Sequence, residues 1–122
     1  MARAASDIPE QVQNLIPLTP AVLFILLVLA GGEKHGYAIM QQVAILSERK
    51  VRMGPGTLYT TIQRLLEQRL IHEVATKSQA DGRRRYYRLT RAGKAVMETE
   101  MGRLEALVRL ARKRKLEFQN NE

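Results

Sequence analysis

Six Lys and Arg side chains crowd a stretch of 15 residues, 77–91, in which Asp81 is the only carboxylate. Repulsion among so many like charges raises the free energy of the bare fold, so the stretch calls for an anionic partner. Phosphate neutralisation, with release of the counterions, is the simplest such role. The alternative is a merely solvated hairpin tip. The cations that we expect to contact phosphate are Lys77, Arg83, Arg84 and Arg85.

A second polar set lies just ahead, on the predicted helix 55–68. Its apolar residues fall on one side at helical spacing, and they are Leu58, Ile62, Leu65 and Leu66. On the other side, an arginine can clamp guanine O6 and N7, and threonines can contact phosphate oxygens or a thymine methyl. An ordinary solvated face is the alternative for this helix taken alone. The residues of this helix that we expect to contact DNA are Thr57, Tyr59, Thr60, Thr61 and Arg64.

The tripeptide His35-Gly36-Tyr37 opens another predicted helix, 36–46. Free N–H groups at a helix start can seat a phosphate, and the Tyr37 hydroxyl could assist. Equally, Gly36 could simply cap the helix while Tyr37 packs. Both interpretations stay open, and Tyr37 joins the candidate DNA-binding residues.

The residue types exclude most catalytic chemistry. Cysteine is absent, which excludes a thiolate zinc site and a cysteine nucleophile, and His35 and His72 are too few to favour a metal cluster or a catalytic triad. The Gly54-Pro55-Gly56 stretch lacks the Gly-Lys-Ser/Thr of a phosphate-binding loop. We therefore expect no enzyme, no metal site and no cofactor. The lack of cysteine also fits a reducing compartment, and we expect a cytoplasmic protein.

Residues 15–32 carry no charge, which raises the question of a leader or a membrane anchor. Pro17 and Pro20 limit the helix to about 11 or 12 residues, which is too short for a bilayer. The flanking carboxylates Asp7 and Glu10 also make a poor leader. We expect a buried core helix and no membrane contact, with a membrane-associated protein as the minor alternative.

The predicted elements give a mainly α chain with a small β-hairpin (α+β), in the order of a winged helix-turn-helix followed by a long C-terminal dimerisation helix. Helix starts and stops favour helices at 20–30, 36–46 and 55–68, and a further one that Thr90 caps and that reaches about Phe118. Helix 36–46 is expected to bury Ile39, Met40, Val43 and Leu46. Strands 70–76 and 84–90 flank the turn Asp81-Gly82. The expected divisions are an N-terminal arm with a short helix at 1–17, a DNA-binding domain at 18–90, and a dimerisation helix with its tail at 91–122.

The last helix carries apolar residues spaced 4, 3, 4 and 3 apart, a heptad seam. So small a domain offers this seam no obvious partner, so we expect a second copy of the chain to cover it. The residues expected at the dimer interface are Leu15, Phe24, Met97, Met101, Leu104, Val108 and Ala111.

Over residues 18–95 the chain resembles the PadR family of bacterial transcriptional regulators. The matching motifs are Leu18-Thr-Pro, His35-Gly36-Tyr37, Gly56-Thr57-Leu58-Tyr59, Arg64-Leu65, Leu70-Ile71, the run from Arg85 to Thr90, and Gly93. The resemblance implies a dimeric winged-helix repressor that binds a palindromic operator and is released by a small-molecule effector. The single helix after the hairpin resembles the short branch of the family, in which that helix builds the dimer.

Two positions depart from the family pattern. Thr60 stands where the family commonly has proline, which bears on the first turns of the DNA-reading helix. The chain also lacks Trp, so a flat drug held between tryptophans is not supported, and an effector at the dimer interface stays an open question.

Residues and resemblance together predict a homodimeric, sequence-specific regulator of transcription that binds double-stranded DNA and represses. The formal net charge of +8 supports a polyanionic partner. The alternative is a winged-helix interaction module whose basic hairpin grips an acidic protein.

Overall fold

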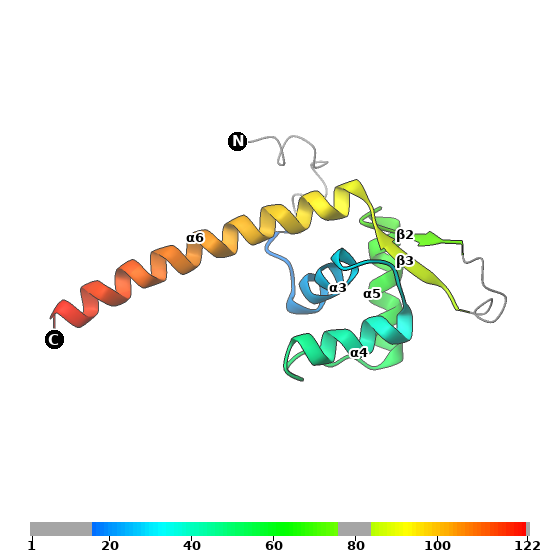
Figure 1. Ribbon diagram of the computed structural model, residues 1–122, viewed down its shortest axis with the longest axis horizontal. Helices are drawn as coiled ribbons and strands as arrows, with labels where there is room; N and C mark the ends of the chain where they lie inside the picture. Colours follow the sequence, from blue (N-terminus) through cyan, green and yellow to red (C-terminus); the bar gives the residue numbers. More distant parts are fainter. Residues whose placement is uncertain (1–15, 76–83, 122) are drawn as a thin grey trace.

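The computed structural model describes residues 16–75 and 84–121 (Figure 1). Its elements follow one another as α3 (Pro20–Ala30), β1 (Lys34–His35), α4 (Gly36–Leu46), α5 (Pro55–Glu67), β2 (Ile71–Val74), β3 (Tyr86–Leu89) and α6 (Arg91–Asn121). The expected fold class, a mainly helical chain with a small antiparallel sheet, is confirmed. Residues 1–15 of the expected arm (1–17) and the turn Asp81-Gly82 lie outside the described residues.

Helix α3 begins and ends where its sequence signals place it. The Thr19 hydroxyl accepts a hydrogen bond from the Val22 N–H at 3.3 Å, Pro20 occupies the first turn, and Gly31 follows the last residue. The helix is apolar all round and lies at the centre of the body, where Ile25 and Leu26 are fully buried. No helix in the described part of the chain is long and apolar enough to span a bilayer.

Helices α4 and α5 complete the helical core around α3. Ile39 and Val43 of α4 and Leu58, Ile62 and Leu65 of α5 are buried with it. The expected burial of Leu46 was wrong. Leu46 is 49% exposed, because it is the last residue of α4 and the chain turns away at Ser47. Leu66 is partly buried and packs against this core from the inner side of α5, as predicted.

Within the described residues the sheet has three strands, in the order β1-β3-β2, where the sequence predicted a two-stranded hairpin. Strand β2 pairs antiparallel with β3, and Ile71 lies opposite Leu89. The additional strand is β1, whose Lys34 and His35 lie opposite Tyr87 and Tyr86. This pairing attaches the start of α4 to the base of the hairpin.

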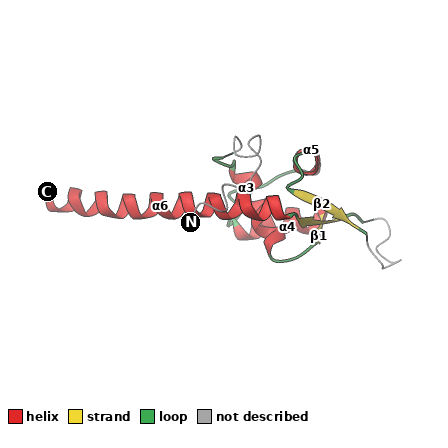
Figure 2. Cartoon of the chain, turned by 90° about the horizontal axis from the view of Figure 1, so that it is seen from above, coloured by secondary structure: helices red, strands yellow, loops and turns green. Residues whose placement is uncertain are grey.

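Helix α6 starts with a close contact and ends far from the body. The Thr90 hydroxyl caps it by accepting from the Gly93 N–H at 3.0 Å, and it also donates to the Arg69 carbonyl at 2.6 Å. Val96 is fully buried against the body, whereas the side chains from Glu105 to Lys115 are all exposed. Both views show the second half of α6 standing clear of the other elements (Figures 1 and 2).

Candidate nucleic-acid interface

Three elements that are distant in sequence meet around one cleft of about 400 Å³. The start of α4, the exposed side of α5 and the base of the β2–β3 hairpin each contribute side chains to it. Its lining residues are His35, Gly36, Tyr37, Tyr59, Arg84, Arg85 and Tyr87. Four predicted DNA-contacting residues from three separate segments, Tyr37, Tyr59, Arg84 and Arg85, are therefore brought together.

His35 organises the cleft from the end of β1. Its Nδ1 accepts a hydrogen bond from the Ala38 N–H at 3.2 Å and so caps α4. A neutral ring whose Nδ1 accepts carries its proton on Nε2. That Nε2 lies 3.3 Å from the Arg84 guanidinium. Two donor groups side by side form a site that suits an anionic oxygen, such as one of a phosphate.

The structure resolves the two interpretations of the His35-Gly36-Tyr37 tripeptide in part. His35, and not Gly36, is the cap of α4. Tyr37 does not pack into the core, since 54% of its surface is exposed. A histidine directly before a helix start is the sequence signal that could have identified this cap, because its ring can accept the hydrogen bond of a free N–H.

Helix α5 presents its polar side as predicted. Thr57, Thr60 and Arg64 are exposed, while Leu58 on the inner side is fully buried. Thr61 differs from its neighbours, because it is partly buried and its hydroxyl donates to the Thr57 carbonyl at 2.8 Å. The Thr61 hydroxyl proton is thus already used within the helix.

The hairpin cations divide between two environments. Arg88 forms an ion pair with Glu33 at 2.9 Å, so its charge is matched by the loop before β1. Arg84 and Arg85 are exposed beside the cleft, and the 3.9 Å contact of Arg85 with Glu73 is a long surface pair of small energetic value. Lys77 and Arg83 lie outside the described residues.

Tyr87 forms the floor of the cleft and belongs to the core. Burial raises the pKa of its hydroxyl, and the nearby Glu73 carboxylate raises it further. The Tyr87 hydroxyl therefore keeps its proton at physiological pH. Among the residues that the structure describes, no three His, Asp or Glu side chains are grouped so that they could hold a metal ion.

Comparison with known proteins places these features in a family. Residues 25–99 match the model of the transcriptional regulator PadR-like family. The chain belongs to the PadR family. This membership confirms the resemblance drawn from the motifs, and it agrees with the expectation of a regulator that is not an enzyme.

Two relatives of this PadR-family chain are similar in sequence. It is 41% identical over 81 residues to the transcriptional regulator Rv3488 of Mycobacterium tuberculosis, an alignment that covers 66% of this chain and 71% of the relative. It is also 37% identical over 91 residues to an uncharacterised 37.1 kDa protein in transposon TN4556 of Streptomyces fradiae. That alignment covers 72% of this chain but only a quarter of the relative.

Solved structures of PadR-family proteins share the fold. A PadR family transcription regulator from Clostridium difficile superposes with a TM-score of 0.66 at 26% identity, covering 78% of this chain and 97% of its own. Bacillus subtilis PadR, solved in complex with operator DNA, superposes with a TM-score of 0.61 at 21% identity. In that case the match covers 70% of this chain and 47% of the other.

The residues predicted for the dimer interface of this PadR-family chain fall into two groups. Phe24 and Met97 are partly buried against the core of their own domain. Farther along α6, Met101 and Leu104 are partly buried, while Val108 and Ala111 are exposed. Leu15 lies outside the described residues.

Proposed function

We propose that the chain binds double-stranded DNA sequence-specifically, as a homodimer on a palindromic operator, and thereby represses transcription in the cytoplasm. The observation that carries the proposal is the cleft of about 400 Å³ at which α4, α5 and the hairpin base meet, with Arg84, Arg85, Tyr37 and Tyr59 on its walls. An aromatic and cationic surface suits a phosphate backbone, and the Glu73 carboxylate makes only a long contact with Arg85, at 3.9 Å.

In this proposal α5 lies in the major groove and reads base edges. The exposed Thr57, Thr60 and Arg64 offer hydroxyls and a guanidinium on one side of the helix. Residues 77–85 of the hairpin lie on the adjacent backbone or in the neighbouring minor groove. The cleft between α5 and the hairpin would hold a phosphate, which would accept hydrogen bonds from the ring Nε2–H of His35 and from the Arg84 guanidinium. This divides the work, because α5 supplies specificity and the hairpin supplies affinity.

The proposed dimer forms along α6. A groove of about 350 Å³ follows its exposed half and is lined by Met101, Leu104, Glu105, Val108, Arg109 and Arg112. A two-fold axis through this seam would present two copies of α5 to one face of the duplex, about 34 Å apart. A small-molecule effector at this interface belongs to the same proposal. Such an effector would be identified as a small molecule whose binding changes the affinity of the dimer for its operator.

The proposed division of the chain follows from these roles. Residues 1–17 form an arm, residues 18–90 the DNA-binding domain, and residues 91–122 the dimerisation helix with its tail.

Repression would then result from a bound dimer that blocks access of the transcription machinery to the promoter. A reporter gene placed behind the selected operator tests whether the chain represses or activates transcription. Under the proposal, co-expression of the chain should lower the reporter output.

Selection of bound sequences from a random duplex pool tests the function. We expect an enriched palindrome, bound with a logarithmic salt slope near about −7 if the dimer neutralises about eight phosphates. The matched variant is Arg64→Ala, which should lose the enriched sequence but still bind duplex DNA. A pool without enrichment, or binding that salt does not weaken, would overturn the proposal and favour an acidic protein as the partner.

A further inference from the structure

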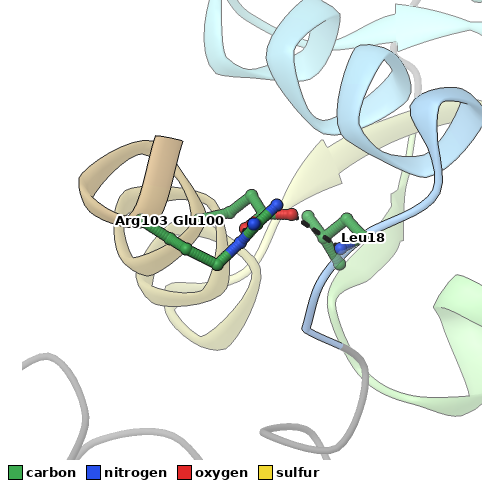
Figure 3. A network of polar contacts seen from close by, with 3 residues as sticks. All are labelled: Leu18, Glu100 and Arg103. Atoms are coloured by element: carbon green, nitrogen blue, oxygen red, sulfur yellow. Dashed lines mark hydrogen bonds and ion pairs between the residues drawn. The ribbon is translucent and has the colours of Figure 1, made fainter. Parts of the chain in front are cut away.

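We propose that Glu100 is the residue that fixes the angle between α6 and the DNA-binding domain, and so determines the half-site spacing that the dimer accepts. Its carboxylate accepts a hydrogen bond at 2.6 Å from the backbone N–H of Leu18, 82 residues earlier in the chain, and its other oxygen accepts a hydrogen bond from the Arg103 guanidinium (Figure 3). The inference rests on the proposed function.

The position of Glu100 along α6 supports this role. Its side chain is 1% exposed, and it is the last buried residue of the helix among those described. Before it, α6 packs on the domain; from Glu105 to Lys115 every side chain is exposed. Glu100 therefore lies at the point where the helix leaves the domain, and any change of angle there acts on the whole projecting part.

The geometry makes this angle consequential. From Glu100 to Asn121 the helix extends roughly 32 Å. A tilt of about 10° at Glu100 moves the far end of the helix by about 6 Å, which exceeds the rise of about 3.4 Å per base pair. In a two-fold dimer the same tilt occurs in both protomers, so even a small change displaces one copy of α5 relative to the other.

The other side of the contact leads to the DNA-reading helix. Leu18 and Thr19 line a cleft of about 210 Å³ together with Thr61 and Arg64 of α5 and with Gln68, which directly follows that helix. The Leu18 amide held by Glu100 thus belongs to the segment that packs beside the base-reading side chains. The contact joins the dimerisation helix to the start of α3, directly beside the reading helix.

A buried carboxylate adds little net stability for the contacts it makes, because desolvation cancels part of the attraction of its partners. It is a good way to fix one arrangement, since both carboxylate oxygens are engaged and any other angle leaves a buried charge without its hydrogen bonds. Apolar side chains at this position could fill the same space at several angles.

The test compares the full-length wild-type chain with Glu100→Gln, Glu100→Met and the control Glu98→Gln, which removes an exposed carboxylate of the same helix. Each protein is titrated with duplexes carrying two copies of the selected half-site at the selected spacing, or with one or two base pairs added or removed. A single half-site, thermal denaturation and sedimentation equilibrium complete the set.

We expect the wild type and Glu98→Gln to lose about tenfold or more in affinity for each altered base pair, and the two Glu100 variants less than about threefold. Affinity for the single half-site and the dimer dissociation constant should change less than twofold. A merely structural role would weaken all duplexes alike and keep the spacing preference.

Two results would overturn the inference. One is a folded, dimeric Glu100 variant with the spacing preference of the wild type. The other is loss of folding in both Glu100→Gln and Glu100→Met, which would make the contact a stability element. Failure of the proposed function is distinguishable, because the wild type itself would then show no dimer or no preferred spacing.

Discussion

The side chain of Tyr59 covers Gly36 so closely that a Cβ atom at position 36 would lie 2.5 Å from the Tyr59 hydroxyl oxygen. The contact joins the first residue of α4 to the exposed side of α5, within the cleft proposed to seat a phosphate. Only a residue without a side chain allows this approach.

Gly36→Ala is expected to displace the half-exposed Tyr59 ring and to weaken binding of the selected duplex by about three- to tenfold, the loss of roughly one hydrogen bond. The free energy of unfolding should change by less than about 1 kcal/mol, because the displaced atoms are the far end of a side chain. Fluorescence anisotropy measures the first and urea denaturation the second. Gly102→Ala is the control, because a Cβ atom at position 102 would have no atom of another part of the chain within 4 Å. Unchanged DNA affinity would remove Tyr59 from the interface.

Replacing Arg64 and replacing Arg84 with alanine should affect DNA binding in different ways. Arg64→Ala should cost about 1–3 kcal/mol on the selected sequence and relax the preference at one base pair, because a base-edge contact is lost. Arg84→Ala should weaken all duplexes to a similar extent and reduce the salt slope by about one. Titration of selected and scrambled duplexes at several salt concentrations separates the two. Equal loss of specificity from both variants would refute this division of work.

Leu104→Glu should yield monomers with much reduced operator affinity, because it places a charge in the apolar seam of α6. Sedimentation equilibrium measures the change. Ala106→Glu is the matched control, since residue 106 is exposed and lies about 200° around the helix from Leu104. A Leu104→Glu protein that remains dimeric would place the interface elsewhere.

Gly93→Ala should destabilise the fold by about 1–3 kcal/mol, because the added methyl group overpacks a tight backbone contact. A Cβ atom there would lie 2.0 Å from the Leu70 carbonyl oxygen, and backbone cannot swing aside as a side chain does. The midpoint of urea denaturation reports the change, again with Gly102→Ala for comparison. An unaltered midpoint would mean that the start of α6 shifts freely against the Leu70 backbone.

Stability should fall in acid, partly through Glu100. The hydrogen bond from Arg103 lowers the pKa of this carboxyl from its ordinary value of 4.5, and the Leu18 N–H lowers it further, against the opposing effect of burial. A carboxyl with a lowered pKa stabilises the fold above pH 4.5, and that contribution is lost as the pH falls through the folded-state pKa. Urea denaturation between about pH 3 and 6 should show a smaller pH dependence for Glu100→Gln. Parallel curves for the two proteins would contradict this.

The helices could be predicted from the sequence because local signals define them. Thr19 with Pro20 marks the start of α3, the range Gly36–Leu46 is correct to the residue, and Thr90 caps α6. In each case a capping group and an apolar period lie within a few residues of one another. The polar side of α5 follows from the same periodicity.

What escaped prediction depends on contacts between distant segments. Strand β1 has only two residues and pairs with β3 about fifty residues later, so no alternation marks it. The burial of Glu100 depends on Leu18, 82 residues away. A signal was nevertheless present, since Glu100 lies on the same helical stripe as Met97 and Leu104, where a charged residue requires a partner.

Hydroxyl-radical footprinting of the full-length chain on its selected duplex tests the central claim most directly. A dimer with α5 in the major groove and the hairpin on the backbone should protect two patches of sugar-phosphate, centred about one helical turn apart on one face. Arg84→Ala should weaken the outer edge of each patch. A single patch, patches on opposite faces, or protection that does not change in Arg84→Ala would contradict the shared surface of helix and hairpin and its two-fold repetition.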